Sequence, residues 1–284
     1  MAFHRMLKHR RIWRRIFYER LTEPLHLNAI SLFVAALGSF ERKVEFDLVL
    51  RAHNAFGILR AAQIAAKQGV REIVALEFGV AAGAGLLNMS MIAVRVEAAT
   101  GVRVRVVGFD SGSGMPPPVD YRDHPDLYVR GDYQMDFDAL QRRLPAGTSL
   151  ILGPIDETVP KFLKELSVPI GYVVIDVDYW SSTCAALRVF DGQPEQYLPM
   201  VICYVDDIQF EENNSWCGEL LAIREFNDAH PLRKIERCDV LLNRRIFKRA
   251  PWLRQIFYLH VLDHPARSFE DTSRPKAALP NPYL

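Results

Sequence analysis

The chain lacks the features that would assign it to several large classes of protein. Its formal net charge is only +1 over 284 residues, so it has no basic surplus for generic nucleic-acid binding. No apolar run reaches the roughly 18 residues that a membrane-spanning helix needs, and the best candidate extends only from 29 to 40. The basic segment before that run is interrupted by Glu19, Glu23 and Pro24, which is unlike a signal peptide. We therefore expect a cytoplasmic protein that does not bind nucleic acid.

Cysteine is also scarce, and two common catalytic motifs are missing. The four cysteines (184, 203, 217 and 238) form no close pair of metal-binding spacing, so reduced thiols are the simplest interpretation. Neither a G-x-S-x-G elbow nor a phosphate-binding P-loop occurs in the sequence. Their absence argues against a serine hydrolase and a nucleoside triphosphatase.

What the chain does contain is a regular alternation of strand and helix patterns. Apolar segments typical of buried strands occur at 73–78, 102–109, 149–152, 172–177 and 200–205. Helical patterns lie ahead of, between and after these segments, at 51–68, 85–99, 137–144, 159–166, 182–190 and 218–229. Two more strands are predicted at 234–242 and 255–262. This order predicts an α/β, doubly wound, Rossmann-like and mostly parallel sheet of seven strands with an antiparallel edge.

Composition divides the chain into three parts. Residues 1–50 are predicted to form a basic, helical N-terminal extension, residues 51–265 the Rossmann-like domain, and residues 266–284 a Pro-rich tail. Residues 4–21 have the pattern of a basic amphipathic helix. Two interpretations of this helix remain open. It either contacts a membrane surface or a partner, or it packs on the main domain.

A glycine-rich turn follows the first predicted strand. Glu77 closes the apolar run, and Gly79, Gly83 and Gly85 follow at short intervals. Glycines at such a turn allow the backbone to approach a ligand closely, and the helix that follows presents free N–H groups. The spacing differs from the dinucleotide fingerprint G-x-G-x-x-G because Ala81 occupies the second glycine position. An acid before the turn suits a cationic or amine-bearing ligand better than a pyrophosphate.

Every predicted parallel strand ends in, or is followed by, acidic residues. They are Glu77, Asp110, Asp156, the pair Asp176 and Asp178, and the pair Asp206 and Asp207. Ligands of open α/β sheets bind beyond the carboxyl ends of the strands, and crowded carboxylates require a counter-charge. The pattern predicts a bound cation or a cationic cofactor at this edge.

Chemistry suggests a role for several of these acids. Asp110 is placed to accept hydrogen bonds from two ribose hydroxyls, although a helix N-cap is the alternative. Asp176, Asp206 and Asp207 offer the oxygen ligands that Mg²⁺ prefers, although Asp206 and Asp207 are also compatible with a loop cap. Asp178 lies two residues beyond Asp176, so it would point the same way if the strand continued. It would then be placed to remove a proton from a hydroxyl near the metal.

The same residues carry a resemblance to a known family. The motifs are E-F-G-V at 77–80, G-F-D-S at 108–111, D-E-T-V-P at 156–160, D-V-D-Y-W-S-S-T at 176–183, and D-D at 206–207. Over roughly residues 70–230 the chain resembles the class I S-adenosylmethionine-dependent methyltransferases, in particular the macrocin and novobiocin type of sugar O-methyltransferase.

The resemblance implies a role for each residue. The residues expected to hold S-adenosylmethionine are Glu77, Gly79, Gly83 and Asp110, with Asp156 near its adenine. The expected Mg²⁺ ligands are Asp176, Asp206 and Asp207. Asp178 is expected to act as the general base.

We therefore expect Mg²⁺-assisted O-methyl transfer to a small hydroxylated acceptor. The loops at 112–133 and 208–217 are expected to contact that acceptor, whose identity they do not reveal. The resemblance also raises the expectation of a homo-oligomer. One alternative is a degenerate Rossmann-fold protein that binds the cofactor and serves assembly or regulation. Another is a methyltransferase-like fold used for a different reaction at the acid cluster, such as hydroxylation or hydrolysis.

Overall fold

The computed structural model describes residues 19–267 and residue 280 of the chain. Its centre is a single sheet with the strand order β3-β2-β1-β4-β5-β7-β6. The strands are β1 (Glu72–Phe78), β2 (Arg103–Asp110), β3 (Thr148–Leu152), β4 (Ile170–Ile175), β5 (Tyr197–Val205), β6 (Arg233–Arg237) and β7 (Ile256–Val261). Strands β1 to β5 run parallel, whereas β7 is antiparallel to both β5 and β6. The predicted parallel sheet with an antiparallel edge is confirmed.

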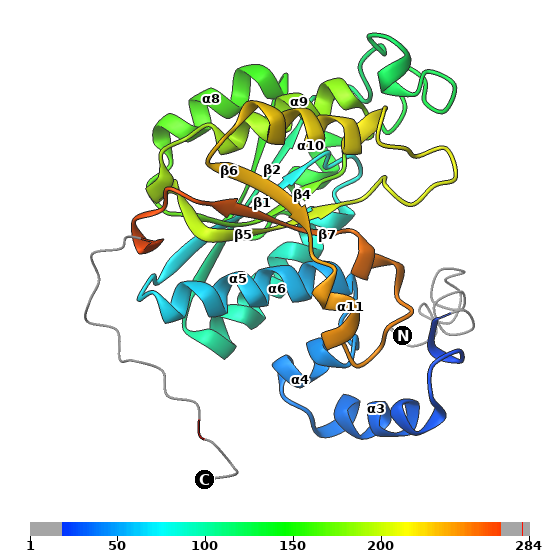
Figure 1. Ribbon diagram of the computed structural model, residues 1–284, viewed down its shortest axis with the longest axis vertical. Helices are drawn as coiled ribbons and strands as arrows, with labels where there is room; N and C mark the ends of the chain where they lie inside the picture. Colours follow the sequence, from blue (N-terminus) through cyan, green and yellow to red (C-terminus); the bar gives the residue numbers. More distant parts are fainter. Residues whose placement is uncertain (1–18, 268–279, 281–284) are drawn as a thin grey trace.

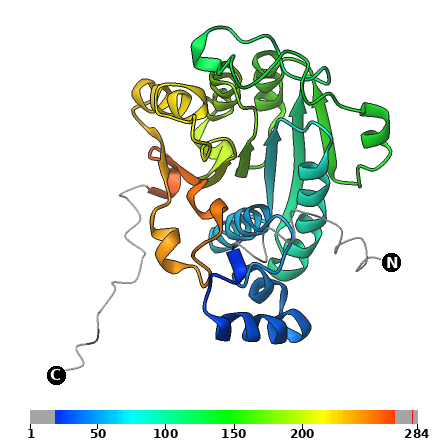
Figure 2. The ribbon, with the colours of Figure 1, turned by 90° about the vertical axis from the view of Figure 1, so that its right-hand side faces the viewer.

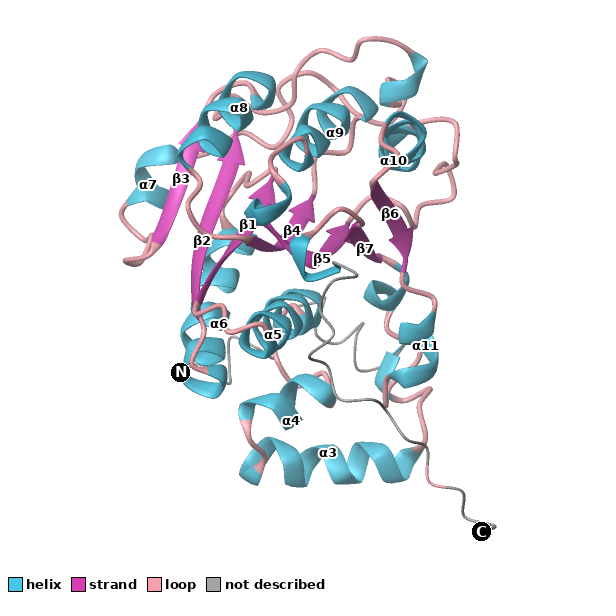
Figure 3. Cartoon of the chain, turned by 60° about the vertical axis from the view of Figure 1, so that its left-hand side comes forward, coloured by secondary structure: helices cyan, strands magenta, loops and turns pink. Residues whose placement is uncertain are grey.

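Helices cover both faces of this sheet. They are α3 (Leu25–Leu37), α4 (Phe40–Glu45), α5 (Ala52–Lys67), α6 (Ala84–Thr100), α7 (Phe137–Gln141), α8 (Ile155–Glu165), α9 (Trp180–Leu187), α10 (Gly218–Ala229) and α11 (Val240–Arg244). Helices α8, α9 and α10 lie on one face, and α5 and α6 lie on the other (Figure 1). Helices α3 and α4 lie farther out, beyond α5 and α6 (Figures 2 and 3).

The composition of the central strands explains this layering. Every residue of β4 is buried, and all but the first residue of β1 are buried. Side chains alternate between the two faces of a strand, and the buried residues of the two faces form two separate apolar clusters. Full burial of one large aliphatic side chain contributes about 1.5–3 kcal/mol. Continuous apolar strands are therefore stable only with helices on both faces.

The N-terminal helices are attached to the segment that leads into β7. Oε1 of Glu23 accepts hydrogen bonds from the backbone N–H groups of Lys248 and Arg249 at 2.6 and 2.7 Å. A buried ion pair joins Arg245 to Asp47 at 2.6 Å. The predicted boundaries at residues 50 and 265 remain predictions.

One predicted strand is partly wrong. The sequence predicts a strand over 234–242, but β6 ends at Arg237 and the apolar residues after it belong to α11. Leu241 of α11 is buried in the apolar cluster that contains α5 and α6. A short apolar run fits a buried turn of helix as well as a strand, so the pattern alone does not separate them.

Most of the segment 4–21, for which an amphipathic helix and a membrane or partner contact are predicted, lies outside the described residues, as does most of the tail 266–284. Within the part of the chain that the structure describes, no helix combines the length and the apolar character that a membrane crossing requires.

Candidate functional site

The carboxyl ends of β1, β2, β4 and β5 meet at one edge of the sheet. Backbone hydrogen bonds connect them in order: Gly79 donates to Phe109 at 3.0 Å, Asp176 to Phe78 at 3.0 Å, and Asp206 to Ile175 at 3.0 Å. The residues that follow these strands therefore lie side by side. The expected convergence of distant acids on a single edge is confirmed.

The glycine-rich turn after β1 has a left-handed backbone at alternate positions. The φ angles are +85° at Gly79, +45° at Ala81 and +80° at Gly83. A Cβ on Gly79 would lie 1.7 Å from the carbonyl oxygen of Asp176, and one on Gly85 would lie 1.7 Å from Oε1 of Glu77. Position 79 therefore requires glycine, because the backbone that follows β4 approaches it so closely, and a side chain at position 85 would displace the Glu77 carboxyl.

Glu77 is buried beneath this turn. Its side chain is only 3% exposed, and its Oε2 has no hydrogen-bond partner among residues 19–267. Burial, and then the nearby charge of Asp176, raise the pKa of Glu77 well above its ordinary value. An unsatisfied buried carboxyl is costly, so this position suits a ligand that donates hydrogen bonds or carries positive charge.

Asp110 closes the turn from the neighbouring strand. Its Oδ2 accepts hydrogen bonds from the backbone N–H groups of Val80 and Ala81, both at 2.9 Å, and its Oδ1 accepts from Gly112 at 2.7 Å. A carboxylate offers about four acceptor positions. Backbone N–H groups use three of them. Asp110 therefore keeps one acceptor position for a further hydrogen-bond donor, such as a ribose hydroxyl.

Two other predicted cofactor residues lie at the margin of the site. Asp156 is exposed in the first turn of α8, close to the edge that β3 forms with β2. The contact of Gly83 is with α7, since a Cβ there would lie 2.2 Å from Cδ1 of Leu140. The structure thus gives Gly83 a packing role, and its predicted role in binding the cofactor stays a prediction.

Three aspartates form a candidate metal centre. One carboxylate oxygen from each of Asp176, Asp206 and Asp207 lies within 4.8 Å of the other two. Oδ1 of Asp206 accepts a hydrogen bond from the Tyr204 hydroxyl at 2.5 Å. Oδ2 of Asp207 is buried, with no partner in the described chain. Burial, followed by the charges of neighbouring acids, raises the pKa of Asp207 from 3.8 to about 11. An all-oxygen set with an unsatisfied member fits a hard divalent cation.

Asp178 reaches the cluster by a route that differs from the prediction. Strand β4 ends at Ile175, and Asp178 has a left-handed φ of +58°. Strand alternation therefore does not orient it, but its charge is close enough to raise the pKa of Asp176. Burial raises the pKa of Asp178 itself, while hydrogen bonds with Asp207 and Tyr128 lower it. A backbone strained in this way is characteristic of functional positions.

Sequence reasoning missed a fifth acid of the cluster, Glu219. This residue is fully buried in the first turn of α10, and its Oε2 accepts a hydrogen bond from the backbone N–H of Asp207 at 3.0 Å. Burial and the charges of Asp176 and Asp206 raise its pKa well above the ordinary value. The available signal was an acid at the start of the helix predicted over 218–229.

Aromatic residues near the cluster were also missed. The ring of His53 stacks on Tyr204, with centroids 4.0 Å apart. The pKa of Tyr128 is raised by burial and by the charges of Asp207 and Asp178, which places it beside the cluster. These residues come from α5 and the loop after β2, and no local spacing links them to the aspartates.

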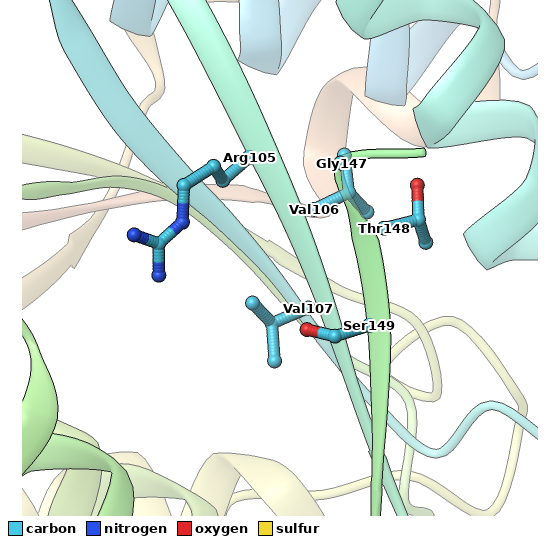
Figure 4. A pocket seen from close by; sticks show the side chains of 6 residues that line it. All are labelled: Arg105, Val106, Val107, Gly147, Thr148 and Ser149. Atoms are coloured by element: carbon cyan, nitrogen blue, oxygen red, sulfur yellow. The ribbon is translucent and has the colours of Figure 1, made fainter. Parts of the chain in front are cut away.

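The structure also has a hollow away from these acids. A cavity of about 280 Å³ is lined by Arg105, Val106, Val107, Gly147, Thr148 and Ser149. These residues belong to the middle of β2, the start of β3 and the turn before β3 (Figure 4). The cavity therefore lies toward the opposite edge of the sheet from the acids.

The strand order and the helices on both faces define a Rossmann-like fold of the kind that O-methyltransferases also adopt. No protein-family model and no curated protein sequence matches the chain. Among solved structures, the O-methyltransferase NovP is similar with a TM-score of 0.50 and 16% identity, over 74% of this chain and 79% of NovP.

Two further solved structures are similar. The calicheamicin methyltransferase CalS11 has a TM-score of 0.48 and 23% identity, over 72% of this chain and 77% of CalS11. The O-methyltransferase from Bacillus cereus, in complex with SAH, has a TM-score of 0.38 and 14% identity, over 81% of this chain and 96% of that chain.

Proposed function

We propose that this protein transfers a methyl group from S-adenosylmethionine to a hydroxyl of a small acceptor, assisted by Mg²⁺. The observation that carries the proposal is the group of Asp176, Asp206 and Asp207 oxygens, within 4.8 Å of one another, beside a glycine turn that lies over a buried acid. Such a concentration of negative charge requires a cationic guest. The class I methyltransferase fold, shared with NovP, supports this interpretation.

The donor substrate would occupy the edge formed by β1 and β2. The residues proposed to hold it are Glu77, Gly79, Gly83, Asp110 and Asp156. When bound, S-adenosylmethionine would supply the methyl group from its sulfonium and leave as S-adenosylhomocysteine. The left-handed turn at Gly79 allows the backbone to approach that donor, and the acceptor capacity left on Asp110 fits a ribose hydroxyl.

The three aspartates would hold the metal. The donor set consists of carboxylate oxygens, and Oδ2 of Asp207 has no partner in the described residues, so the side chains present fit Mg²⁺. When bound, Mg²⁺ would lower the pKa of an acceptor hydroxyl and help to orient it. Glu219 supports Asp207 through the backbone hydrogen bond at 3.0 Å.

Asp178 is the proposed general base. It lies next to the aspartate cluster, and burial raises its pKa above the usual range for an aspartate. A carboxylate whose pKa is nearer to the working pH accepts a proton more effectively. As the new O–CH₃ bond forms and the S–CH₃ bond breaks, the hydroxyl proton passes to a carboxylate oxygen of Asp178.

Calorimetry with S-adenosylmethionine, with and without Mg²⁺, tests the proposal. We expect the wild-type protein to bind the donor, and to bind Mg²⁺ through its three aspartates. The double variant Asp176→Asn, Asp206→Asn should lose Mg²⁺ binding and methyl transfer. Asp228→Asn, in the exposed last turn of α10, is the matched control and should behave like wild type.

Binding of neither donor nor metal by the wild-type protein would overturn the proposed function. If the wild-type protein does bind both, a screen of hydroxylated metabolites for release of S-adenosylhomocysteine would identify the methyl acceptor.

A further inference from the structure

Arg51 has a backbone conformation that an arginine rarely adopts. It is the N-cap residue of α5, with φ +52° and ψ +68°. A left-handed conformation costs a residue other than glycine about 1–3 kcal/mol, and persists only where the surroundings impose it. Arg51 does not belong to any motif of the sequence, so spacing and composition do not single it out.

A buried network of polar side chains imposes the conformation. Nδ2 of Asn88 in α6 donates to the carbonyl of Leu50 at 3.2 Å. Nδ2 of Asn54 donates to Oδ1 of Asn88 at 3.3 Å, and the Tyr172 hydroxyl of β4 donates to Oδ1 of Asn54 at 2.9 Å. The start of α5 is thereby fixed to both α6 and β4.

The same network places Arg51 at the candidate site. Two residues farther along α5, His53 stacks on Tyr204 at 4.0 Å, and the Tyr204 hydroxyl bonds to Asp206 at 2.5 Å. The first turn of α5 therefore lies against the carboxyl edge of β5. In agreement with this placement, the positive charge of Arg51 lowers the pKa of Glu77 and of Asp176, against the larger effect of burial.

Among the described residues, no anionic side chain forms an ion pair with the Arg51 guanidinium. No hydrogen bond or ion pair joins the half-buried Arg51 side chain to any other residue of 19–267. By contrast, Arg245 pairs with Asp47 at 2.6 Å and also donates to the carbonyl of Val44. The network holds the backbone of Arg51, and its cationic side chain acts on the buried acids Glu77 and Asp176, so the site combines a cationic group with acidic ones.

We propose that Arg51 binds the α-carboxylate of the methionyl group of S-adenosylmethionine. This inference rests on the proposed function. The amino-acid end of the donor carries an ammonium and a carboxylate on one carbon. Binding it therefore requires an acidic side chain and a cationic side chain next to each other. Glu77 offers the acid, and Arg51 offers the planar fork of donors that suits a carboxylate.

Calorimetry with two ligands that differ only in the carboxylate isolates this contact. The ligands are S-adenosylhomocysteine and its decarboxylated analogue, and the variant is Arg51→Asn, because asparagine tolerates a left-handed backbone. We expect Arg51→Asn to weaken S-adenosylhomocysteine binding by about 10- to 100-fold, the effect of a hydrogen bond to a charged group. Affinity for the analogue should remain within twofold.

Two further variants complete the test. Arg51→Lys keeps the charge but not the fork, so we expect a weakening between that of wild type and that of Arg51→Asn. Arg60→Gln, on the same helix roughly 13 Å along its axis, should bind both ligands like wild type.

The outcomes separate this inference from the proposed function. Equal weakening of both ligands in Arg51→Asn would overturn the inference, since Arg51 would then support the fold or the general field of the site. Unchanged binding of both ligands, with a raised KM for an anionic acceptor, would also overturn it and assign Arg51 to the acceptor. If wild type binds neither ligand, the proposed function itself fails.

Discussion

The two edges of the sheet differ in a way that separates shape from chemistry. The amino edge of β2 and β3 carries a hollow of about 280 Å³, lined by Arg105, small side chains and hydroxyls. The Thr148 hydroxyl shares a 2.7 Å hydrogen bond with the hydroxyl of the neighbouring Ser90, and no side chain of this lining has a buried polar atom without a partner in the described chain. At the carboxyl edge, Glu77, Asp207 and Glu219 each keep a buried oxygen without a partner in the described chain. Unsatisfied charge, not the size of a hollow, identifies the edge that requires a ligand.

The comparison also assigns a cost to each edge. A buried polar atom without a partner destabilises a protein by roughly 1–3 kcal/mol, and like charges held together add to that cost. Folding alone gives no reason to collect acids from β1, β4, β5 and α10. A cationic guest would remove much of the penalty, whereas nothing at the amino edge would change.

The largest contrast between the edges should appear in turnover. Asp178→Asn removes the proposed base, and asparagine tolerates the φ of +58° at this position. We expect kcat to fall by about 10²- to 10⁴-fold, the usual contribution of a general base. Affinity for S-adenosylmethionine, measured by calorimetry, should stay within a few-fold. An equal loss of turnover and affinity would contradict the assignment of Asp178 as the base.

The next effect concerns stability at the glycine turn. Gly79→Ala would place a Cβ 1.7 Å from the Asp176 carbonyl oxygen, and we expect the free energy of unfolding to fall by about 3 kcal/mol. Gly101→Ala is the matched control, with a similar φ of +73° and no heavy atom within 4 Å of the new Cβ. It should cost about 1 kcal/mol. Urea denaturation measures both values. If the two variants lost the same free energy of unfolding, the backbone after β4 would move aside at little cost.

A smaller effect should appear in the pH dependence of stability without Mg²⁺. The pKa of Asp207 rises on folding from 3.8 to about 11, so the folded state favours its protonated form. The stability gained from that form is complete below pH 3.8 and is lost as the pH rises toward the folded pKa, by up to about 1.4 kcal/mol per pH unit. We expect Tm to decrease between about pH 6 and pH 9, and Asp207→Asn to reduce this slope.

The exposed Asp228→Asn variant is the control for that slope and should retain it. A slope in Asp207→Asn as steep as in wild type would show that Asp207 is already ionised in the folded protein.

The smallest effect is expected at the hollow of the amino edge. Arg105→Ala should change the free energy of unfolding by less than about 1 kcal/mol and leave donor affinity within twofold, because no step of the proposed function involves this edge. Denaturation and calorimetry measure both. A tenfold loss of donor affinity would overturn the contrast between the two edges.

Local pattern was sufficient to predict much of the fold. Continuous apolar runs predicted β1, β2 and β5 to within a few residues. The helical pattern over residues 218–229 predicted α10 with the bounds that the structure has. Acids that follow parallel strands could be predicted to converge, because all carboxyl ends of such strands lie at one edge. Chain direction alone therefore predicted the grouping of Asp176, Asp206 and Asp207.

The rest depends on contacts that sequence spacing does not encode. Ser181 resembles a helix cap, but α9 begins at Trp180, and both the N–H and the hydroxyl of Ser181 bond to Asp123 from a distant loop. Arg51 and Glu219 belong to the site because a buried network and a helix start place them there. Tertiary packing determines where both side chains lie, and neither residue belongs to a sequence motif.

The contact between Gly79 and the Asp176 carbonyl has a consequence for redesign. It joins the turn proposed to hold the donor to Asp176, a proposed metal ligand, with no intervening space, so neither element can be altered without disturbing the other. An engineer who wants to accept a bulkier donor analogue should leave this junction intact. The outer margin near Asp156, where the side chain already faces solvent, offers room for new groups.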